Sequence, residues 1–427
     1  MKKPVIDEMF DLIIRGEYDK LENISRPEDA IHIRSVISTN NIGGAGLAIN
    51  LKDITDRAPW ITPLFLGPRL YLNSASTTVQ NSMTGGKSNV LIDWSFSFDS
   101  NVAEKVRAYV NHENINETDR NCVITLLKLK KEYALQTDLI PFLFENLRLA
   151  RTNKNNERPL NTIVAFKKLD YLDWNAFEKD PLKPIFQCDE DRLIEEARKT
   201  HDDLINEKEL RNREYKALFT QVILFELAII WLKGSASPEA TFRTLIDFCV
   251  LQLKKMPKYE LMFAWSFLSN PNKIRFFGPL NGIAKDLPKA LRGMAWDISH
   301  MRTLETMSTA SNHGSFFIPF FVSFDDKFSE ILKQNQIQIL LMDDRLKRMH
   351  SAGTGEQAFQ IKLNSCISPQ VANEMTISKS EARRAYNLSA DELERILCIQ
   401  EKILVEIASN ARLARSNKHR PDQQEDL

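Results

Sequence analysis

The chain has 427 residues, with 57 Lys and Arg balanced by 57 Asp and Glu, 43% hydrophobic residues and only 14 glycines. Its zero net charge excludes a protein that binds polyanions through its overall field. The few glycines disfavour glycine-rich β architectures and phosphate-cradling loops. Since a hydrophobic core stops growing at about 250–300 residues, we expect two or three structural units. The five scattered cysteines form no close pair, which indicates reduced thiols in a cytoplasmic protein.

Residues 1–88 are expected to form an N-terminal accessory region. The pattern predicts a helix over residues 4–15, and its acidic residues interrupt the apolar core that a secretory signal needs. The stretch Thr84-Gly85-Gly86-Lys87-Ser88 is similar to a phosphate-binding loop. Asn81 stands where that motif requires its first glycine, and a strand rather than a helix is expected to follow, so we reject this interpretation.

Residues 89–150 have the clearest pattern in the chain. Trp94, Phe96 and Phe98 alternate with serines, as expected for a strand that ends at Asp99. Helices are then predicted over 101–110, 121–134 and 141–151, the last with Pro141 in its first turn, where a missing N–H costs nothing.

Residues 151–279 contain long helical patterns and are expected to form a mainly helical insertion. Its apolar stretch 217–232 includes Gln221 and Glu226 and is shorter than the roughly 20 residues that span a bilayer. We therefore expect a buried helix and no membrane association. The insertion is our candidate surface for a protein partner or a second copy of the chain.

Residues 280–345 are predicted to contain a helix over 284–307 and an apolar strand that ends before Asp325. Because proline cannot donate to a sheet ladder, we expect that strand to begin at Phe320, after Pro319. Residues 346–410 are expected to be helical, with a capping box that begins at Ser389. Residues 411–427 are polar and are expected to form a disordered tail.

Four acids interrupt apolar surroundings in this chain: Asp99, Glu145, Asp297 and Asp325. Burying a carboxylate is costly unless a cation or hydrogen bonds compensate, so four acids at the edge of one core imply a partner. Mg²⁺ or Mn²⁺ is the natural partner, because these ions prefer oxygen ligands and can activate water for attack on a phosphodiester. Taken singly, each acid is explained as well by a structural role, such as a helix cap.

The ordered series of acids resembles the PIN-like nuclease domains. The resemblance is carried by Asp99-Ser100-Asn101, Phe144-Glu145-Asn146, Trp296-Asp297-Ile298-Ser299-His300 and Ser323-Phe324-Asp325. It implies an α/β fold with a parallel sheet flanked by helices, its two halves at 89–150 and 280–345. It also implies a metal-dependent endoribonuclease in which the four acids hold the metal and Ser323 and His300 orient the substrate. Asp297 lies 152 positions after Glu145, a longer gap than the family has, which requires the helical insertion.

Large PIN-like proteins of this kind suggest toxin-like effectors or antiviral defence against phage. A nuclease also needs positive charge for the nucleic-acid backbone. Residues 148–168 contain six basic residues and one acid, a net charge of +5, and we identify Arg148, Arg151, Lys154 and Arg158 as candidate RNA contacts. An exposed, solvated loop explains this stretch equally well.

Other interpretations stay open at this point. Asp93 is a rival to Asp99, but at ~3.3 Å per residue the two lie about 20 Å apart and cannot bind one metal. Asp326 is an alternative to Asp325. The acids at 189–191 are similar to a Toprim phosphotransfer site, although acids at a helix N-terminus explain them too. The main competitor to a nuclease is a non-enzymatic interaction or regulatory protein whose acids are structural.

Overall fold

The computed structural model describes residues 4–24, 27–39, 51–84, 90–153, 156–234, 237–311, 315–376, 379, 382–383 and 385–418. The protein is a mixed α/β protein that is mostly helical, with two four-stranded sheets. It divides into two compact units, one of residues 1–211 and 301–357 and the other of residues 212–300 and 358–427. Both sheets belong to the first unit.

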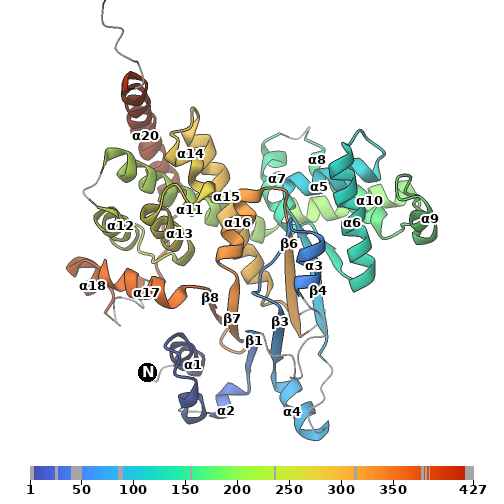
Figure 1. Ribbon diagram of the computed structural model, residues 1–427, viewed down its shortest axis with the longest axis horizontal. Helices are drawn as coiled ribbons and strands as arrows, with labels where there is room; N and C mark the ends of the chain where they lie inside the picture. Colours follow the sequence, from blue (N-terminus) through green and yellow to red (C-terminus); the bar gives the residue numbers. More distant parts are fainter. Residues whose placement is uncertain are drawn as a thin grey trace, which may run out of the picture. The chain divides into compact units, whose positions relative to one another are not determined.

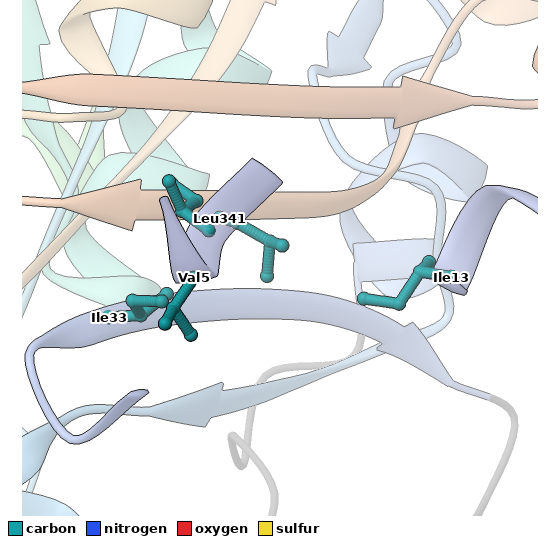
Figure 2. Packing of buried hydrophobic residues seen from close by; sticks show 5 residues of the cluster. Val5, Ile13, Ile33 and Leu341 are labelled. Atoms are coloured by element: carbon teal, nitrogen blue, oxygen red, sulfur yellow. The ribbon is translucent and has the colours of Figure 1, made fainter. Parts of the chain in front are cut away.

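One sheet of the first unit is antiparallel throughout. Its strand order is β3-β1-β7-β8, with the bounds β1 Ile33–Thr39, β3 Arg69–Asn73, β7 Ile337–Asp343 and β8 Arg348–Gly353. Helix α1 (Val5–Ile14) packs its buried side chains Val5 and Ile13 near Ile33 of β1 and Leu341 of β7 (Figure 2). The apolar residues that recur along α1 form this face, as the helical pattern predicts.

The other sheet is mixed and carries the parallel strands. Its order is β2-β6-β4-β5, with the bounds β2 Ile61–Pro63, β4 Ile92–Phe98, β5 Gln136–Asp138 and β6 Phe316–Val322. β4 lies parallel to both β5 and β6, and β2 lies antiparallel to β6. All seven residues of β6 are buried, which is typical of a strand covered on both faces.

The prediction that the last apolar strand begins at Phe320 is wrong, because β6 begins at Phe316 and contains Pro319. The Pro319 carbonyl accepts a hydrogen bond from Leu64 N–H on the β2 side. The Pro319 nitrogen faces the same side, and β2 itself pairs only as far as Phe320. The missing N–H therefore removes no bond from either ladder, and a proline is tolerated here.

Helices surround the sheets of the first unit. Those that follow β4 and β5 form a group in which α5 contacts α6, α7 and α8, and α7 contacts β4 (Figure 1). The α-helices of this unit after α1 are α2 Pro27–Ala30, α3 Leu51–Arg57, α4 Ala75–Thr84, α5 Ser100–Val110, α6 Glu117–Tyr133, α7 Ile140–Thr152, α8 Arg158–Leu169, α9 Trp174–Lys179, α10 Glu190–Ile205 and α16 Asp326–Gln334. A 3₁₀ helix covers Tyr18–Asn23.

The second unit contains only helices among its described residues. They are α12 Pro238–Asp247, α13 Lys258–Ser269, α14 Gly278–Asn281, α18 Pro369–Glu374 and α20 Ala390–Lys418, with a π-helical turn over Phe248–Gln252 and a 3₁₀ turn over Arg275–Phe277. Three helices cross a unit boundary: α11 Lys208–Lys233, α15 Leu287–Met307 and α17 Glu356–Ser365. In the described part of the chain, α11 alone is long and apolar enough to cross a membrane, and 61% of its most apolar window is buried within the protein.

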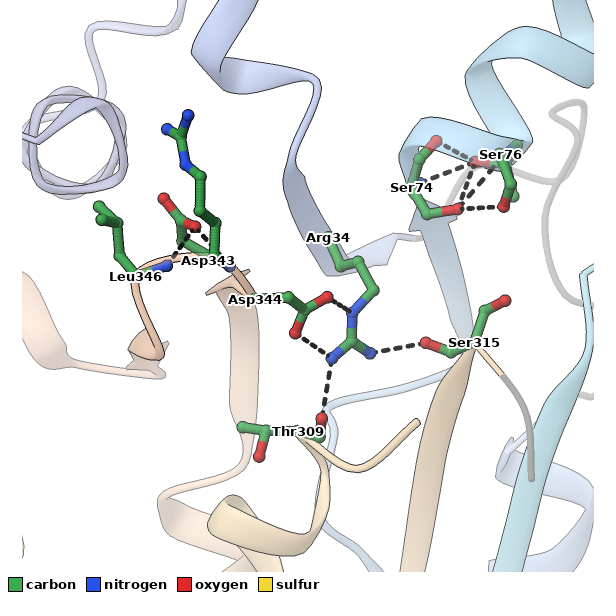
Figure 3. A network of polar contacts seen from close by, with 10 residues as sticks. Arg34, Ser74, Ser76, Thr309, Ser315, Asp343, Asp344 and Leu346 are labelled. Atoms are coloured by element: carbon green, nitrogen blue, oxygen red, sulfur yellow. Dashed lines mark hydrogen bonds and ion pairs between the residues drawn. The ribbon is translucent and has the colours of Figure 1, made fainter. Parts of the chain in front are cut away.

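Arg34 links the two sheets of the first unit (Figure 3). Its guanidinium donates two hydrogen bonds to Asp344, at 2.6 and 2.7 Å, directly after β7. It also donates to the carbonyl of Ser315, which precedes β6, at 2.6 Å, and to that of Thr309 at 2.8 Å. The side chain is only 8% exposed, so these bonds compensate a buried charge.

The sequence predicted α1, α5, α6, α7, α11, α15 and α20 and the two long strands of the mixed sheet, but not α2, α3, α4 or α16, and the fold differs from a single parallel sheet. β2 adds an antiparallel strand to it, and the whole antiparallel sheet was not expected. β8 occupies the start of the 346–410 region, which was predicted to be helical. The capping box is confirmed, since Ser389 N–H donates to Glu392 and Glu392 N–H donates back to Ser389. The rejected phosphate loop, apart from Thr84, lies outside the described residues. The tail expected to be disordered over 411–427 is helical over 411–418, where α20 continues to Lys418, and residues 419–427 lie outside the described residues.

Candidate metal centre

Two parallel strands end side by side at the candidate site. β4 ends at Phe98 and β6 at Val322, which pair in register. Asp99 and Ser323 follow directly, and Ser323 Oγ donates a hydrogen bond of 2.7 Å to Asp99 Oδ2. The chain leaves β4 to form β5 on one side, whereas β6 lies on the other. Such a switch in strand order at the carboxyl edge is where open α/β sheets bind ligands.

Asp99 has a structural role as well as a chemical one. Its backbone is extended, and its Oδ1 accepts a hydrogen bond of 2.6 Å from the N–H of Ser100, the first residue of α5. Asp99 is therefore the N-cap of that helix. The cap fixes one carboxylate oxygen and the bond from Ser323 fixes the other, so the carboxylate is held in one orientation.

Glu145 reaches the same point from α7. The helix begins after β5 and buries Phe142, while Glu145, three residues later, is half-buried. Ser100 Oγ donates a hydrogen bond of 2.6 Å to Glu145 Oε2. Asn146 Nδ2 donates 2.9 Å bonds to Ser100 Oγ and to the Phe142 carbonyl, which positions the hydroxyl. Ser100 thus connects the two acids, because its N–H donates to Asp99 and its hydroxyl donates to Glu145.

A histidine completes a group of three donors. One carboxylate oxygen each of Asp99 and Glu145 and a ring nitrogen of His300 all lie within 4.8 Å of one another. His300 is 3% exposed and lies on α15 directly before Met301, where that helix enters the first unit. Two carboxylates and an imidazole at this separation are a donor set suited to a divalent cation.

The electrostatics of the site favour a proton or a cation at Asp99. Burial, together with the charges of Glu145 and Asp325, raises the pKa of Asp99 to about 6. The hydrogen bonds from Ser323 and from the Ser100 N–H oppose this shift, because they stabilise the charged form. A carboxyl that is costly to ionise becomes less so when a metal ion supplies positive charge.

The structure brings together two of the four acids that the sequence singled out. Asp99 and Glu145 belong to the donor group, whereas Asp297 is half-buried on α15 and the carboxylate of Asp325 is exposed, and neither is a member of it. Asp325 caps α16 by accepting from Lys327 and Phe328 N–H at 2.8 and 3.3 Å. The third donor is His300, one turn after Asp297, which sequence reasoning had given an orienting role. The sequence signal for it was a histidine three residues after an acid, on the same face of a predicted helix.

Acidic side chains from other helices compensate part of the positive charge of residues 148–168. Arg158 forms an ion pair with Glu104, Lys167 with Glu196 at 3.8 Å and Lys168 with Glu190 at 2.5 Å. Arg148 is half-buried. Lys154 and the side chain of Arg151 lie outside the described part of the chain. The net charge of +5 therefore does not describe an uncompensated surface.

The rival acids have other positions. Asp189 is the N-cap of α10 and accepts from Arg192 N–H at 3.2 Å, as the structural explanation of that acidic run predicted. Asp93 lies near the start of β4 and lines a pocket that contains no member of the donor group. The exposed carboxylate of Asp326 lies in the first turn of α16.

Comparison with known proteins adds no family to this picture. The chain matches no family model, no curated protein and no solved structure.

Proposed function

We propose that the protein is a metal-dependent phosphodiesterase of the nuclease class, acting on RNA. One observation carries the proposal: Asp99 and Glu145 are drawn together by Ser100 at the carboxyl edge of parallel strands, with His300 as a third donor. Like charges at this separation repel unless a cation lies between them. Three side chains hold the two carboxylates in place through hydrogen bonds: Ser100, Asn146 and Ser323.

The donor set favours Mn²⁺ over Mg²⁺. Mg²⁺ takes almost only oxygen ligands, whereas Mn²⁺ also accepts imidazole nitrogen, and His300 supplies one. When bound, such an ion would lower the pKa of a water molecule and polarise a phosphoryl oxygen. Asp99 and Glu145 would hold it, and their fixed orientations would place the scissile phosphate. Asp325 is exposed and its charge acts on Asp99, so it would lie where the substrate approaches the same edge of the sheet.

The PIN-like resemblance supports the same activity through the order of its motifs, with Asp297 and Asp325 as further acids. In this proposal the helical residues between Glu145 and Asp297 interrupt the domain. The competing function is a non-enzymatic interaction protein. The ion pairs that compensate Arg158, Lys167 and Lys168 favour it, because they reduce the charge available to a nucleic-acid backbone.

The test measures metal binding and nucleic-acid cleavage on the same protein and variants. Mn²⁺ and Mg²⁺ are titrated into the purified full-length protein by calorimetry, and labelled single-stranded RNA, structured RNA and DNA are incubated with each metal or with EDTA. We expect saturable Mn²⁺ binding and RNA cleavage that EDTA abolishes. Asp99→Asn and Glu145→Gln should each remove both, whereas Asp203→Asn, an exposed acid on α10, should change neither.

The outcomes separate the two functions. Mn²⁺ binding that depends on Asp99 without cleavage of any nucleic acid would favour the interaction protein with a structural metal. Cleavage that survives both Asp99→Asn and Glu145→Gln would show that the activity resides elsewhere, and the proposed centre would have to be abandoned.

A further inference from the structure

A second polar site lies on the mixed sheet, and none of its lining residues belongs to the donor group. A pocket of about 850 Å³ is lined by five polar residues, Asp93, Ser95, Gln136, Thr137 and Asp138, and by apolar side chains that include Ile92, Met307 and Phe317. All of its lining residues belong to the first unit. Among them there are two carboxylates and no Lys, Arg or His. The pocket is therefore negatively charged on an apolar base.

The register of the strands explains why these groups meet. Asp93, Ser95 and Ser97 alternate along β4 and so share one face of the sheet. β5 pairs with β4 only from Ser95 to Ser97. Asp93 consequently has Phe317 of β6 as its neighbour on one side and no β5 residue on the other. The short edge strand leaves the amino half of β4 open to the pocket.

Asp138 is the fixed acid of this pocket. Ser97 Oγ donates to its Oδ2 at 2.8 Å, and Ile140 N–H donates to its Oδ1 at 2.9 Å. Each oxygen keeps lone-pair capacity for a further donor. Burial, together with the charge of Asp93, raises the pKa of Asp138 to about 6. Since the lining contains no Lys, Arg or His, a bound cation would stabilise the ionised form of Asp138.

Ser95 gives an independent indication of a ligand. The residue is 2% exposed, lines the pocket, and its Oγ has no hydrogen-bond partner. A buried hydroxyl without a partner is unfavourable, and most such groups in proteins are paired. Its place on the face shared by Asp93 and Ser97 makes it available to a donor bound between the two acids.

We propose that this pocket binds a small organic cation, an elongated amine whose ammonium groups meet Asp93 and Asp138 and whose aliphatic chain lies on Ile92, Met307 and Phe317. Asp93 is four residues along β4 from Ser97, the register partner of Asp138, which is roughly 13 Å at ~3.3 Å per residue. A diamine or polyamine spans that separation of the two backbone positions, whereas one metal ion, with ligands at about 2.0–2.6 Å, is too small to bridge it.

Spermidine is the probe, titrated into the full-length protein by calorimetry at low salt and pH 7.5. We expect saturable binding at one site, and no binding of 1,8-octanediol, which has a similar length and no charge. In Asp138→Asn the amide oxygen can still accept from Ile140 N–H, and the Ser97 hydroxyl can turn to accept from the amide NH₂. The variant should therefore fold, and it should weaken binding by about tenfold or more. Asp93→Asn should have a similar effect, and Ser95→Ala a smaller one. Asp203→Asn is the control and should bind as the wild type does.

A further variant separates this pocket from the metal centre. Asp99→Asn with Glu145→Gln should bind spermidine unchanged, because neither residue lines the pocket. The proposal is overturned if the wild type shows no saturable binding, or if Asp93→Asn and folded Asp138→Asn both bind normally. It is also overturned if only the Asp99 and Glu145 variant loses binding, or if Mn²⁺ alone saturates the Asp138 site and spermidine does not.

Discussion

Ser323 donates its hydroxyl to the carboxylate of Asp99 at 2.7 Å, across 224 positions of sequence. Each residue directly follows a strand, and the two strands lie parallel and in register. The same hydroxyl accepts the N–H of Asp325 at 3.0 Å, so one serine orders both the acid after β4 and the turn after β6. This bond connects the first half of the proposed site to the second.

Replacing Ser323 with alanine should weaken Mn²⁺ binding in a pH-dependent way. The hydroxyl stabilises ionised Asp99, so its loss raises the pKa of that group further above about 6. A metal ion competes with the proton, and we expect roughly three- to tenfold weaker binding at pH 6.5 and a smaller loss at pH 8.5. Calorimetric titration at the two pH values measures this. Ser329→Ala, which removes a buried hydroxyl without a partner, is the matched control, and an equal loss there would contradict the role of Ser323.

His300 and Asp297 lie one turn apart on α15 and make opposite predictions. His300 belongs to the donor group and Asp297 does not. We expect His300→Asn to lower the affinity for Mn²⁺ by about tenfold and to affect Mg²⁺ less, because an imidazole nitrogen favours the softer ion. Asp297→Asn should leave both affinities nearly unchanged. If Asp297→Asn removes metal binding and His300→Asn does not, the four acids identified in the sequence describe the centre better.

Asp138→Asn should stabilise the protein at neutral pH. The pKa of Asp138 is about 6 in the folded protein against an ordinary value of 3.8, so the folded state binds more protons between these values. The free energy of unfolding then falls as pH rises from 3.8 to about 6. Asparagine does not titrate, and its advantage over the wild type should grow by about 1–3 kcal/mol from pH 4 to pH 8. Urea unfolding at both pH values measures the difference; an advantage that shrinks with rising pH would be inconsistent with a raised pKa.

Arg34→Lys should destabilise the first unit. A lysine cannot reproduce the paired bonds to Asp344 together with those to the Ser315 and Thr309 carbonyls. Leaving the half-buried Ser315 and Thr309 carbonyls unpaired is expected to cost about 2–4 kcal/mol of unfolding free energy. Arg345→Lys is the control, since Arg345 is 50% exposed and pairs with Asp29. It should cost less than about 1 kcal/mol. Comparable losses in the two variants would show that Arg34 is no more than a surface ion pair.

The elements with strong periodicity could be predicted from the sequence. The alternation before Asp99 is β4, the apolar run before Ser323 is β6, and the capping box at Ser389 opens α20. The acids Asp99 and Glu145 were found because each interrupts apolar surroundings, and an unexplained charge next to a core is a local signal. An acid within an apolar stretch can be recognised without knowing how the strands are connected.

The short and antiparallel strands and the choice of His300 could not be predicted, because they depend on contacts between segments that are distant in the sequence. β5 has three residues, too few to show any period, and it takes its strand conformation from the ladder with Ser95–Ser97. β1 and β7 stabilise each other across the chain, which no local pattern records. His300 could not be chosen over Asp297 from sequence, because both point along one stripe of a helix and only the position of α15 in three dimensions decides between them.

The pairing of the strands also sets when the protein can fold during synthesis. The central strands of both sheets join an early segment to a late one: β1 pairs with β7, and β4 with β6. A ribosome that has released the first 300 residues has delivered neither β6 nor β7. Until then β4 carries the buried rings of Phe96 and Phe98 without its main partner strand. Assembly of the first unit, and with it the edge that holds Asp99, must therefore wait for nearly the whole chain, so folding should be slow and premature termination should leave an insoluble product.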